Sequence, residues 1–497
     1  MPNANNAART QRTRHRVDPV AEDLGRRFRD AGFQLALVGG SVRDTLLGRL
    51  GHDLDFTTDA RPEQVLKILR PWADAVWEVG IAFGTVGARK DVPAVRTESA
   101  DEAESAGGAV GAAGAPGSFQ IEVTTYRSES YDRTSRKPEV SYGDTIEDDL
   151  VRRDFTVNAM AVALPGTDFI DPYGGLDDLA ARRLRTPGTP EASFSDDPLR
   201  MMRAARFAAQ LDFEVAPEVV AAMTAMADRI GIVSAERIRD ELNKLLLSDH
   251  PIKGLRLLVD TGLADRVLPE LPALRLELDE HFRHKDVYEH SLTVLEQAID
   301  LEEDGPDLTL RLAALLHDIG KPRTRRFEQD GRVSFHHHEM VGAKMTKARM
   351  TQLKYPNDLI KDVSRLVGLH LRFHGYGSGE WTDSAVRRYV RDAGPQLDRL
   401  HKLTRSDCTT RNKRKADALS RTYDGLETRI GELQEREELD AIRPDLDGNQ
   451  IMRVLAVPPG PVVGRAYQYL LELRLENGPL GEEEAVAALR EWWAAQG

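Results

Sequence analysis

The pattern of apolar and polar residues divides the chain into a part that contains strands and a longer part that is helical. Residues 18–32 have apolar residues at helical spacing, and residues 61–75 share that pattern. Apolar runs or strict alternation predict strands in three further segments, 33–40, 52–58 and 119–127. Strands and helices that mix in this way predict an α/β unit with a mixed sheet between residue 31 and about residue 165.

Beyond about residue 177 the signals for strands fade, and amphipathic helical patterns dominate, as in residues 197–211, 234–247 and 251–262. Residues 96–118 are poor in large apolar side chains and rich in Gly, Ala, Ser and Glu, which is typical of a flexible insertion. We therefore predict a multidomain protein with a disordered tail (1–17), an α/β head (18–165), a helical neck and body (166–275), a helical domain rich in histidine (276–410) and a helical tail (411–497).

Length and charge narrow the range of functions. A chain of 497 residues is long enough for about three domains. A formal charge of −13 excludes nonspecific coating of nucleic acid as the whole function but leaves room for local basic patches. The single cysteine, Cys408, can form no internal disulfide, and no apolar run approaches the roughly 18 residues of a membrane-spanning helix. These features predict a protein of the cytoplasm with no membrane partner.

The first candidate site begins at a glycine turn after the first predicted strand. Gly39 and Gly40 would let backbone N–H groups approach a phosphate closely. Arg43, in the first turn of the helix that follows, supplies a positive charge at the same point. Together these residues predict a cradle for a triphosphate.

Two carboxylates follow on the second predicted strand. Asp53 and Asp55 are two residues apart, so their side chains share one face while Leu54 and Phe56 share the other. Carboxylates this close repel each other unless divalent cations lie between them. Glu122, on the third predicted strand, is a candidate for a third catalytic carboxylate. The pattern predicts nucleotidyl transfer that depends on Mg²⁺.

The chain resembles the bacterial CCA-adding tRNA nucleotidyltransferases and the related bacterial poly(A) polymerases in six successive segments: GGSVRDTLLGR, DLDFTT, YRSESYDRTSRKPEVSYG, DLVRRDFTVNAMA, DPYGGLDDL and DDPLRMMRAARFAAQL. The resemblance implies a head, neck, body and tail, and it implies a set of residues that bind nucleotide or Mg²⁺: Gly39, Gly40, Arg43, Asp53, Asp55, Arg153, Asp154, Asn158, Asp197, Arg200, Arg203 and Arg206. For Arg153 the alternative is a surface ion pair with Asp148 or Asp149.

The last of these segments also has a physical interpretation. Ser195 is expected to cap a helix in which Arg200, Arg203 and Arg206 recur every three residues, and three arginines on one side need an anion such as a nucleotide. Asp197 and Arg200 are spaced as a pair of acceptor and donor. Cytosine and adenine each present an exocyclic amine beside a ring nitrogen, so this pair would accept C and A and reject G and U.

A second set of motifs resembles the HD phosphohydrolase domain: DVYEHSL, LAALLHDIGKP, SFHHHEMVGAK, VGLHLRFH and LTRSDCTT. His317 and Asp318 end an apolar helix, where packing would hold them as metal ligands. The resemblance implies that His290 and Asp407 complete one metal set with this pair. Mixed imidazole and carboxylate ligands suit Mn²⁺, Ni²⁺, Co²⁺ or Mg²⁺.

The resemblance implies that a second ion binds His338 and His370. In the run of three histidines, only His338 keeps the family's spacing to the glycine that follows, so His336 and His337 are expected to be surface residues. Such a domain would trim 2′,3′-cyclic or terminal phosphates from RNA ends, or it would serve only as a scaffold.

A short basic run follows the HD motifs and consists of Arg411, Lys413, Arg414 and Lys415. Such runs are usually solvated faces, and a tRNA acceptor stem is the alternative partner here. The segments RPDLDGNQIM and PPGPVVGRAYQYLLELRLENGPL resemble the C-terminal stretch of CCA-adding enzymes.

Three functions compete. The first is addition of C, C and A to tRNA 3′ ends from CTP and ATP with Mg²⁺, by a monomer or homodimer. The second is a poly(A) polymerase that adds AMP to RNA 3′ ends. The third is a metal phosphohydrolase with an RNA-binding head. A pair of aspartates beside a glycine turn argues against the third, and an acidic chain favours a compact tRNA over tracking along single strands.

Overall fold

The structure is a computed structural model of the chain, and it describes residues 18–49, 51–78, 80–81, 84–92, 117–126, 143, 145–166, 168–275, 286–329, 333–373, 382–409, 413–437 and 442–496. The chain forms two compact units, which are described separately. Unit 1 lies within residues 1–237 and 249–266, and unit 2 lies within residues 238–248 and 267–497.

The predicted N-terminal tail and most of the predicted insertion lie outside the described residues. The insertion ends earlier than expected, because Gly117 and Ser118 already belong to strand β5. Their backbone pairs with the end of strand β4, which overrides their weak intrinsic preference for strands. The other domain boundaries stay predictions.

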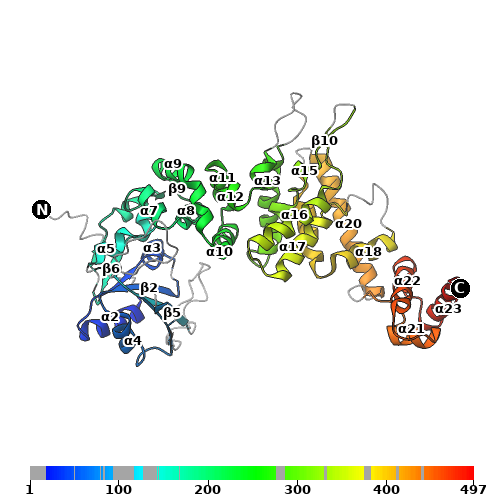
Figure 1. Cartoon of the computed structure of the whole chain (residues 1–497), viewed down its shortest axis with the longest axis horizontal. Coiled ribbons are helices and arrows are strands. Elements are labelled where there is room, and N and C mark those ends of the chain that lie inside the picture. Colours follow the sequence, from blue (N-terminus) through cyan, green and yellow to red (C-terminus); the bar gives the residue numbers. More distant parts are fainter. Residues whose placement is uncertain are drawn as a thin grey trace, which may run out of the picture. The chain divides into compact units, whose positions relative to one another are not determined.

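A seven-stranded mixed sheet lies at the centre of unit 1 (Figure 1). Its strands are β1 (Leu35–Val38), β2 (Asp53–Thr58), β3 (Ala75–Trp77), β4 (Thr85–Val92), β5 (Gly117–Thr125), β6 (Ala161–Leu164) and β7 (Phe169–Ile170). Their order is β3-β4-β5-β2-β1-β6-β7. Strands β2 and β5 are parallel, and the other neighbours are antiparallel. The predicted mixed α/β fold is confirmed.

The two faces of the sheet are covered by different helices. Helices α2 (Pro19–Asp30) and α4 (Pro62–Leu69) pack on one face, and α3 (Gly40–Leu46) and α5 (Ile146–Val151) contact the other. Ala36 and Val38 of β1 share a core with Leu150 of α5. Because side chains alternate and Ala36 pairs with Thr57, Asp53 and Asp55 lie on the face of α3 and α5.

The helix predicted over residues 61–75 is shorter than expected. It ends at Leu69, and Ala75–Trp77 form strand β3. Pro71 has no N–H to donate to the Lys67 carbonyl, so the helical hydrogen bonds are interrupted there, although Arg70 before it still has helical geometry. Strand β3 packs closely on β4, since a Cβ at Gly87 would lie 1.9 Å from the Trp77 indole nitrogen.

The rest of unit 1 is helical apart from the short parallel pair β8 (Arg183–Leu184) and β9 (Glu214–Val215). Its helices are α6 (Gly175–Ala180), α7 (Pro190–Asp196), α8 (Leu199–Leu211), α9 (Pro217–Met226) and α11 (Pro251–Asp260), with α10 (Ala235–Leu246) and α12 (Ala264–Val267) at the boundary between the units. Helix α8 is almost entirely buried and packs against α11.

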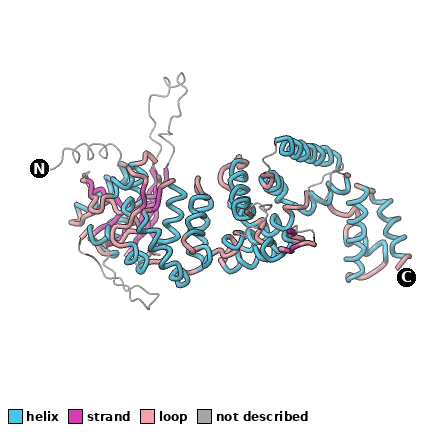
Figure 2. Tube along the Cα trace, turned by 90° about the horizontal axis from the view of Figure 1, so that it is seen from above, coloured by secondary structure: helices cyan, strands magenta, loops and turns pink. Residues whose placement is uncertain are grey.

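Unit 2 is helical apart from the two-stranded pair β10 (Arg326–Phe327) and β11 (Val333–Ser334), as Figure 2 shows. Its helices are α13 (Val287–Asp300), α14 (Leu308–Leu316), α15 (Lys321–Thr324), α16 (His338–Gln352), α17 (Asn357–Leu369), α18 (Asp383–Ala393), α19 (Leu397–Ser406), α20 (Lys413–Glu437), α21 (Gly448–Leu455), α22 (Pro461–Asn477) and α23 (Glu482–Ala494). The last three share a hydrophobic core. Among the described residues, no helix has the length and apolar character needed to span a bilayer.

Candidate active site and metal centre

Three carboxylates meet on one face of the sheet in unit 1. The parallel register places Asp55 of β2 opposite Glu122 of β5, and Asp53 lies two residues before Asp55. The Ser41 hydroxyl, on helix α3, donates a hydrogen bond to the Asp53 carbonyl (3.0 Å) and accepts one from the Asp55 N–H (3.0 Å). Ser41 therefore fixes the carboxylate strand to the glycine turn, a role that the sequence analysis missed.

Two of these carboxylates, Asp55 and Glu122, hold protons more tightly than ordinary ones. Desolvation raises the pKa of Asp55, and the Asp53 carboxylate raises it further, although Arg153 opposes the shift. Desolvation also raises the pKa of Glu122, with repulsion from Asp55 and Asp53 in the same direction. A bound cation would remove this repulsion, so the three residues fit a site for divalent metal.

The glycine turn requires glycine at its first position. Gly39 has φ 70° and ψ −135°, a conformation that other residues rarely adopt. A Cβ there would also lie 2.8 Å from Nη1 of Arg153. Arg153 donates to Asp149 at 3.1 Å, which is one of the two partners considered for it as a surface residue. Its Nε is nevertheless buried without a hydrogen-bond partner, so the guanidinium keeps one N–H that can donate a hydrogen bond to an anion.

Arg43 is a buried part of a polar network and not an open phosphate ligand. Its guanidinium donates to Asp44 and, at 2.6 Å, to the Oδ1 of Asn158. The Asn158 amide donates to Asp154, and Arg203 donates to the other oxygen of the same carboxylate. Burial would raise the pKa of Asp154, but the charge of Arg203 and these hydrogen bonds lower it well below its usual range. The network therefore holds an ionised aspartate between two arginines.

Phe207 lies at the centre of this arrangement. The guanidinium carbons of three arginines lie 5.1 Å (Arg43), 5.4 Å (Arg203) and 3.8 Å (Arg206) from the centroid of its ring. The ring, Arg43 and Arg206 are buried, and cation–π contacts in such a desolvated setting are worth about 2 kcal/mol, whereas Arg203 is partly exposed and its contact is worth less. Phe207 was not among the residues that the sequence predicted for the site.

Asp197 and Arg200 do not contact each other through their side chains as the predicted pair would. Asp197 accepts a hydrogen bond from Arg237 at 2.7 Å, and Arg200 donates to the Ser193 hydroxyl at 2.9 Å. The expected cap was also wrong, because Ser195 lies inside helix α7, and the Asp197 side chain instead accepts the Leu199 N–H at 3.1 Å. Both side chains keep hydrogen-bonding capacity, since a carboxylate accepts about four bonds and a guanidinium donates five.

The HD motifs of unit 2 come together as two groups of candidate metal ligands. The ligand atoms of His290, His317 and Asp407 lie within 4.8 Å of one another, and so do those of a second group, which comprises Asp318, His338 and His370. Asp318 falls in the second group, and it also lies beside the set to which it was assigned, since one of its oxygens is 3.6 Å from the His290 Nε2. One of its oxygens lies 3.2 Å from the His317 Nε2 and the other 3.2 Å from the His338 Nε2, so the carboxylate adjoins both groups.

Hydrogen bonds to the backbone orient three of these histidines. The Nδ1 of His317, His338 and His370 lies 2.7–2.8 Å from the carbonyl three residues earlier in each case. If Nδ1 carries the proton, each Nε2 presents its lone pair, which is the form that binds a metal. All three Nε2 atoms and one oxygen of Asp318 are buried without a hydrogen-bond partner. Divalent metal ions would satisfy these atoms.

The electrostatics of the metal-free centre favour the ligand forms of His370 and Asp407, whereas the carboxylates of Asp318 and Asp407 raise the pKa of His317 against its desolvation. Burial lowers the pKa of His370 to about 4, so its ring is neutral at physiological pH. Desolvation opposes ionisation of Asp407, but hydrogen bonding from His290 and the charge of His317 lower its pKa below its usual range. Lys321 lies 2.5 Å from Asp318 and supplies a fixed positive charge beside the centre.

Close backbone packing holds the two ligand segments together. Gly320 lies two residues after Asp318, and a Cβ at this position would be 2.1 Å from the His338 carbonyl oxygen. A larger residue would therefore push the ligands of the second group apart. His336 and His337, in contrast, are exposed, as expected.

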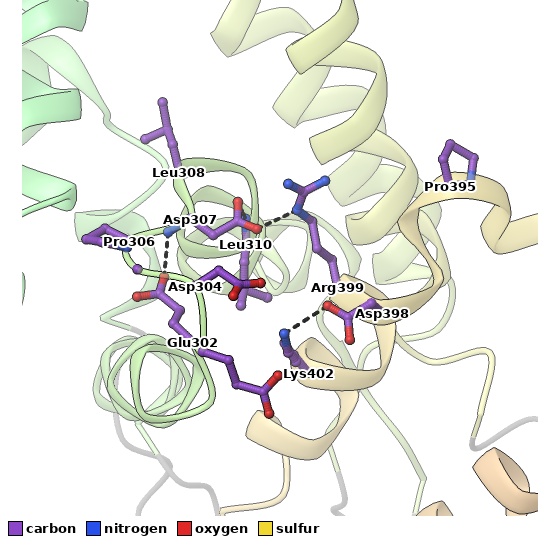
Figure 3. A pocket seen from close by; sticks show the side chains of 12 residues that line it. Glu302, Asp304, Pro306, Asp307, Leu308, Leu310, Pro395, Asp398, Arg399 and Lys402 are labelled. Atoms are coloured by element: carbon purple, nitrogen blue, oxygen red, sulfur yellow. Dashed lines mark hydrogen bonds and ion pairs between the residues drawn. The ribbon is translucent and has the colours of Figure 1, made fainter.

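A pocket of about 500 Å³ in unit 2 contains none of the candidate ligands (Figure 3). Acidic side chains dominate its lining, and several are paired, as between Asp307 and Arg399 (2.5 Å) and between Asp398 and Lys402 (2.9 Å). An acidic lining repels phosphate, so this pocket does not suit a nucleotide.

Half of the predicted basic run is described. Lys413 and Arg414 are exposed at the start of helix α20, Arg411 lies outside the described residues, and the side chain of Lys415 is not described. Contact of this run with RNA stays a prediction.

Comparisons with known proteins identify the family. Residues 35–185 match the family model described as Poly A polymerase head domain, residues 212–274 match the probable RNA and SrmB-binding site of polymerase A, and residues 287–412 match the HD domain. The A-adding tRNA nucleotidyltransferase of Deinococcus radiodurans is 37% identical over 359 residues, which cover 71% of this chain and 80% of that protein. The chain belongs to the family of tRNA nucleotidyltransferases and poly(A) polymerases. It is therefore a nucleotidyltransferase with an HD domain.

Other relatives of this nucleotidyltransferase carry a different name. The CCA-adding enzyme of Levilactobacillus brevis is 38% identical over 245 residues, but the match spans only 54% of that enzyme. The structure of the Bacillus stearothermophilus CCA-adding enzyme in complex with CTP matches with a TM-score of 0.62 and 24% identity, and the match covers 97% of this chain and 99% of that one. This likeness supports the fold along nearly the whole chain.

We expect Asp55→Asn to abolish nucleotide addition while stabilising the metal-free protein at neutral pH. Because the pKa of Asp55 is raised in the folded state, the ionised carboxylate destabilises the fold once the pH exceeds the pKa of an unfolded aspartate. The amide lacks that charge but cannot replace the carboxylate as a Mg²⁺ ligand. Melting in EDTA at pH 7 and incorporation with Mg²⁺ measure the two effects. Asp168→Asn is the control, and near-normal incorporation by Asp55→Asn would exclude this site.

Phe207→Leu should raise KM for the nucleotide about fivefold to tenfold, because the arginines around the ring lose contacts worth about 1 kcal/mol or more. Phe28→Leu is a matched control, since Phe28 is equally buried but lies on α2. Both variants should lose stability, and only Phe207→Leu should change KM. Equal KM values in the two variants would show that the ring does not organise the site.

Removal of divalent metal should lower the melting temperature of the HD domain, and Mn²⁺ should restore it. Metal at about 100 times its Kd stabilises the folded state by roughly 2.7 kcal/mol if it binds only that state. His370→Ala should abolish the response, whereas His336→Ala, at an exposed position, should keep it. A wild-type melting curve that is the same in EDTA and in Mn²⁺ would contradict a metal centre.

Proposed function

We propose that the head extends the 3′ end of tRNA with C, C and A from CTP and ATP. The observation that supports this proposal most is the set of three carboxylates, Asp53, Asp55 and Glu122, on one sheet face beside a glycine turn. The name of the Deinococcus radiodurans relative agrees with a tRNA substrate. One related structure contains CTP, and the Thermotoga maritima enzyme was solved with tRNA. A tRNA substrate and a single cysteine favour work in the cytoplasm.

Each part of the proposed site has a separate task. The three carboxylates would hold Mg²⁺, which when bound polarises the phosphate and stabilises the attacking and leaving oxygens. The backbone N–H of Gly40, with the buried Nε of Arg153, would bind the triphosphate, while the N–H of Gly39 already donates to the Met160 carbonyl at 3.3 Å. The Asp154 carboxylate holds Arg203 in place, so the guanidinium keeps its orientation while the nucleotide binds.

We propose that Asp197 and Arg200 read the base. Asp197 would accept a hydrogen bond from the exocyclic amine of C or A, and Arg200 would donate a hydrogen bond to the ring nitrogen beside that amine. Both residues are held by other contacts, Asp197 by Arg237 and Arg200 by Ser193. Such contacts orient the side chains before the nucleotide arrives, which lowers the entropy cost of binding.

The most direct test is incubation of the purified protein with tRNA that lacks all of its 3′ CCA and with tRNA that ends in CC, each with single nucleotides and with mixtures. Addition of C, C and A to the shorter tRNA supports the proposal. Addition of A alone to the CC end would make the protein an A-adding enzyme like its Deinococcus radiodurans relative. Long runs of A on unrelated RNA would support the poly(A) polymerase alternative.

We expect Arg200→Ala to raise the use of UTP and GTP relative to CTP and ATP. A polarity-matched site rejects the wrong base chiefly by leaving its polar groups unpaired, and this variant removes one of those groups. Arg203→Ala is the control, since Arg203 contacts Asp154 and should affect all four nucleotides equally. If Arg200→Ala also lowers kcat/KM equally for all four, the residue does not read the base.

We propose a second activity for the HD domain, the hydrolysis of terminal phosphates on RNA ends. The observation that favours it is the set of buried ligand atoms without partners on His317, Asp318, His338 and His370. Metal bound there would be Mn²⁺, Ni²⁺, Co²⁺ or Mg²⁺ and would activate water toward the phosphorus. Asp318→Ala should remove hydrolysis of an RNA 3′-phosphate and leave nucleotide addition within a few-fold of normal. If wild-type protein shows no such activity with any of the four metals, the hydrolase proposal is wrong and the HD domain serves as a scaffold.

A further inference from the structure

A short two-stranded ribbon next to the HD centre exposes an aromatic ring. We define the ribbon as Arg325–Phe327 and Val333–Ser334, in which Phe327 pairs with Val333. Phe327 is 68% exposed, the highest value among the large apolar side chains of the described residues. The guanidinium of Arg325 lies 4.8 Å from the centroid of its ring. One cation therefore accompanies the ring, while much of the ring surface faces solvent.

Both strands of the ribbon lead directly to metal-ligand segments. The first follows Asp318 through helix α15, and the second leads through Phe335 to His338 at the start of α16. The Phe335 carbonyl lies 2.8 Å from the Nδ1 of His338 and orients this ligand. The Lys321 ammonium lies 2.5 Å from Asp318 and 5.7 Å from the Phe335 ring. These contacts fix the base of the ribbon at the edge of the candidate metal centre.

The approach to the ribbon is positively charged in a chain that is acidic overall. Residues 321–326 contain one lysine and three arginines, whereas the whole chain has a formal charge of −13, and the carboxylate that follows Phe327, Glu328, accepts a hydrogen bond from Ser334. Arg323 and Arg326 are exposed, and Lys321 is half-buried beside Asp318. Exposed arginines beside an exposed aromatic ring match the phosphates and flat bases of an unpaired RNA strand.

We propose that the ribbon binds the 3′-terminal nucleotide of single-stranded RNA, with the base stacked on Phe327 and the terminal phosphate directed toward the HD centre. This inference rests on the hydrolase function proposed above, and it assigns to that site a preference for polynucleotide ends over small phosphate esters. The Arg325 guanidinium and the Phe327 ring supply a surface that accepts any base, because every base has a flat π face.

Phosphatase assays on the full-length protein with Mn²⁺ separate stacking from chemistry. Three phosphomonoesters are compared: a ten-nucleotide RNA with a 3′-phosphate, the same RNA with no base on its last nucleotide, and glycerol 2-phosphate. Phe327→Ala should lower kcat/KM for the intact RNA about tenfold, the order expected when one base loses an aromatic stacking partner. The other two substrates should be unaffected, and Phe327→Trp should behave like wild type. Tyr467→Ala is the control at an exposed aromatic residue of α22.

A crosslinking experiment tests binding independently of hydrolysis. RNA that ends in 4-thiouridine should crosslink to the peptide that contains Phe327, and the yield should fall in Phe327→Ala but not in Tyr467→Ala. If the crosslink forms while wild-type protein hydrolyses no substrate, the ribbon binds RNA and the hydrolase proposal is wrong. Unchanged crosslinking and unchanged kcat/KM in Phe327→Ala would overturn the inference. Self-association that Phe327→Ala abolishes, without any crosslink, would also overturn it and assign the ring to a contact between copies.

Discussion

The parallel pairing of β2 with β5 is the constraint on which the head depends. This register places Asp55 opposite Glu122 and leaves Asp53 on the same face, so that three like charges are held close by backbone hydrogen bonds. Arg153 and other nearby arginines offset part of the repulsion, yet the pKa of Asp55 remains raised. The fold therefore holds negative charge that is only partly compensated at this point, and a bound divalent cation would neutralise it.

The HD centre also holds several candidate metal ligands close together, but with histidines in place of most of the carboxylates. Its histidines lie at or near helix ends, and a carbonyl three residues earlier orients the rings of His317, His338 and His370, whereas His290 contacts Thr409 and Asp407. Imidazoles bring no repulsion when neutral, so more ligands can be gathered in a buried place than carboxylates alone would allow. Two of the candidate ligands are carboxylates, Asp318 and Asp407. Asp318 directs one oxygen toward each group of ligands. Oxygen ligands in the head and mixed ligands here favour different metals.

Local patterns in the sequence were enough to predict much of the fold. Alternation on β2 predicted that Asp53 and Asp55 share a face, and the apolar run before His317 predicted a buried helix that ends at a ligand. The predicted cap at Ser195 failed on a nearby signal, because Pro190 starts a helix earlier and places Ser195 inside α7. The predicted pairing of Asp197 failed because its partner is distant in sequence, and no local signal shows that Arg237 reaches Asp197.

Similar reasons explain the residues of the site that were missed. The hydroxyl of Ser41 acts through strand β2, and the role of Phe207 depends on Arg43, which lies more than 160 positions earlier in the chain. The glycine turn itself contains a signal for Ser41, since a small hydroxyl residue follows the two glycines directly. The motif could have suggested the residue, but only the folded chain shows which backbone atoms it binds.

The arginines of the head illustrate how such a network serves a nucleotide site. The sequence alone predicted that these arginines bind phosphate directly. In the structure Asn158 holds Arg43 and Asp154 holds Arg203, and both guanidinium groups also contact the Phe207 ring. Holding a guanidinium in this way removes most of its rotamer entropy before a ligand arrives, so less is lost on binding. The ionised Asp154 makes this possible without leaving a buried cation unpaired. The Nε of Arg153, beside the glycine turn, has no hydrogen-bond partner. A buried donor without a partner destabilises the fold, and a bound triphosphate would remove this penalty by accepting its hydrogen bond.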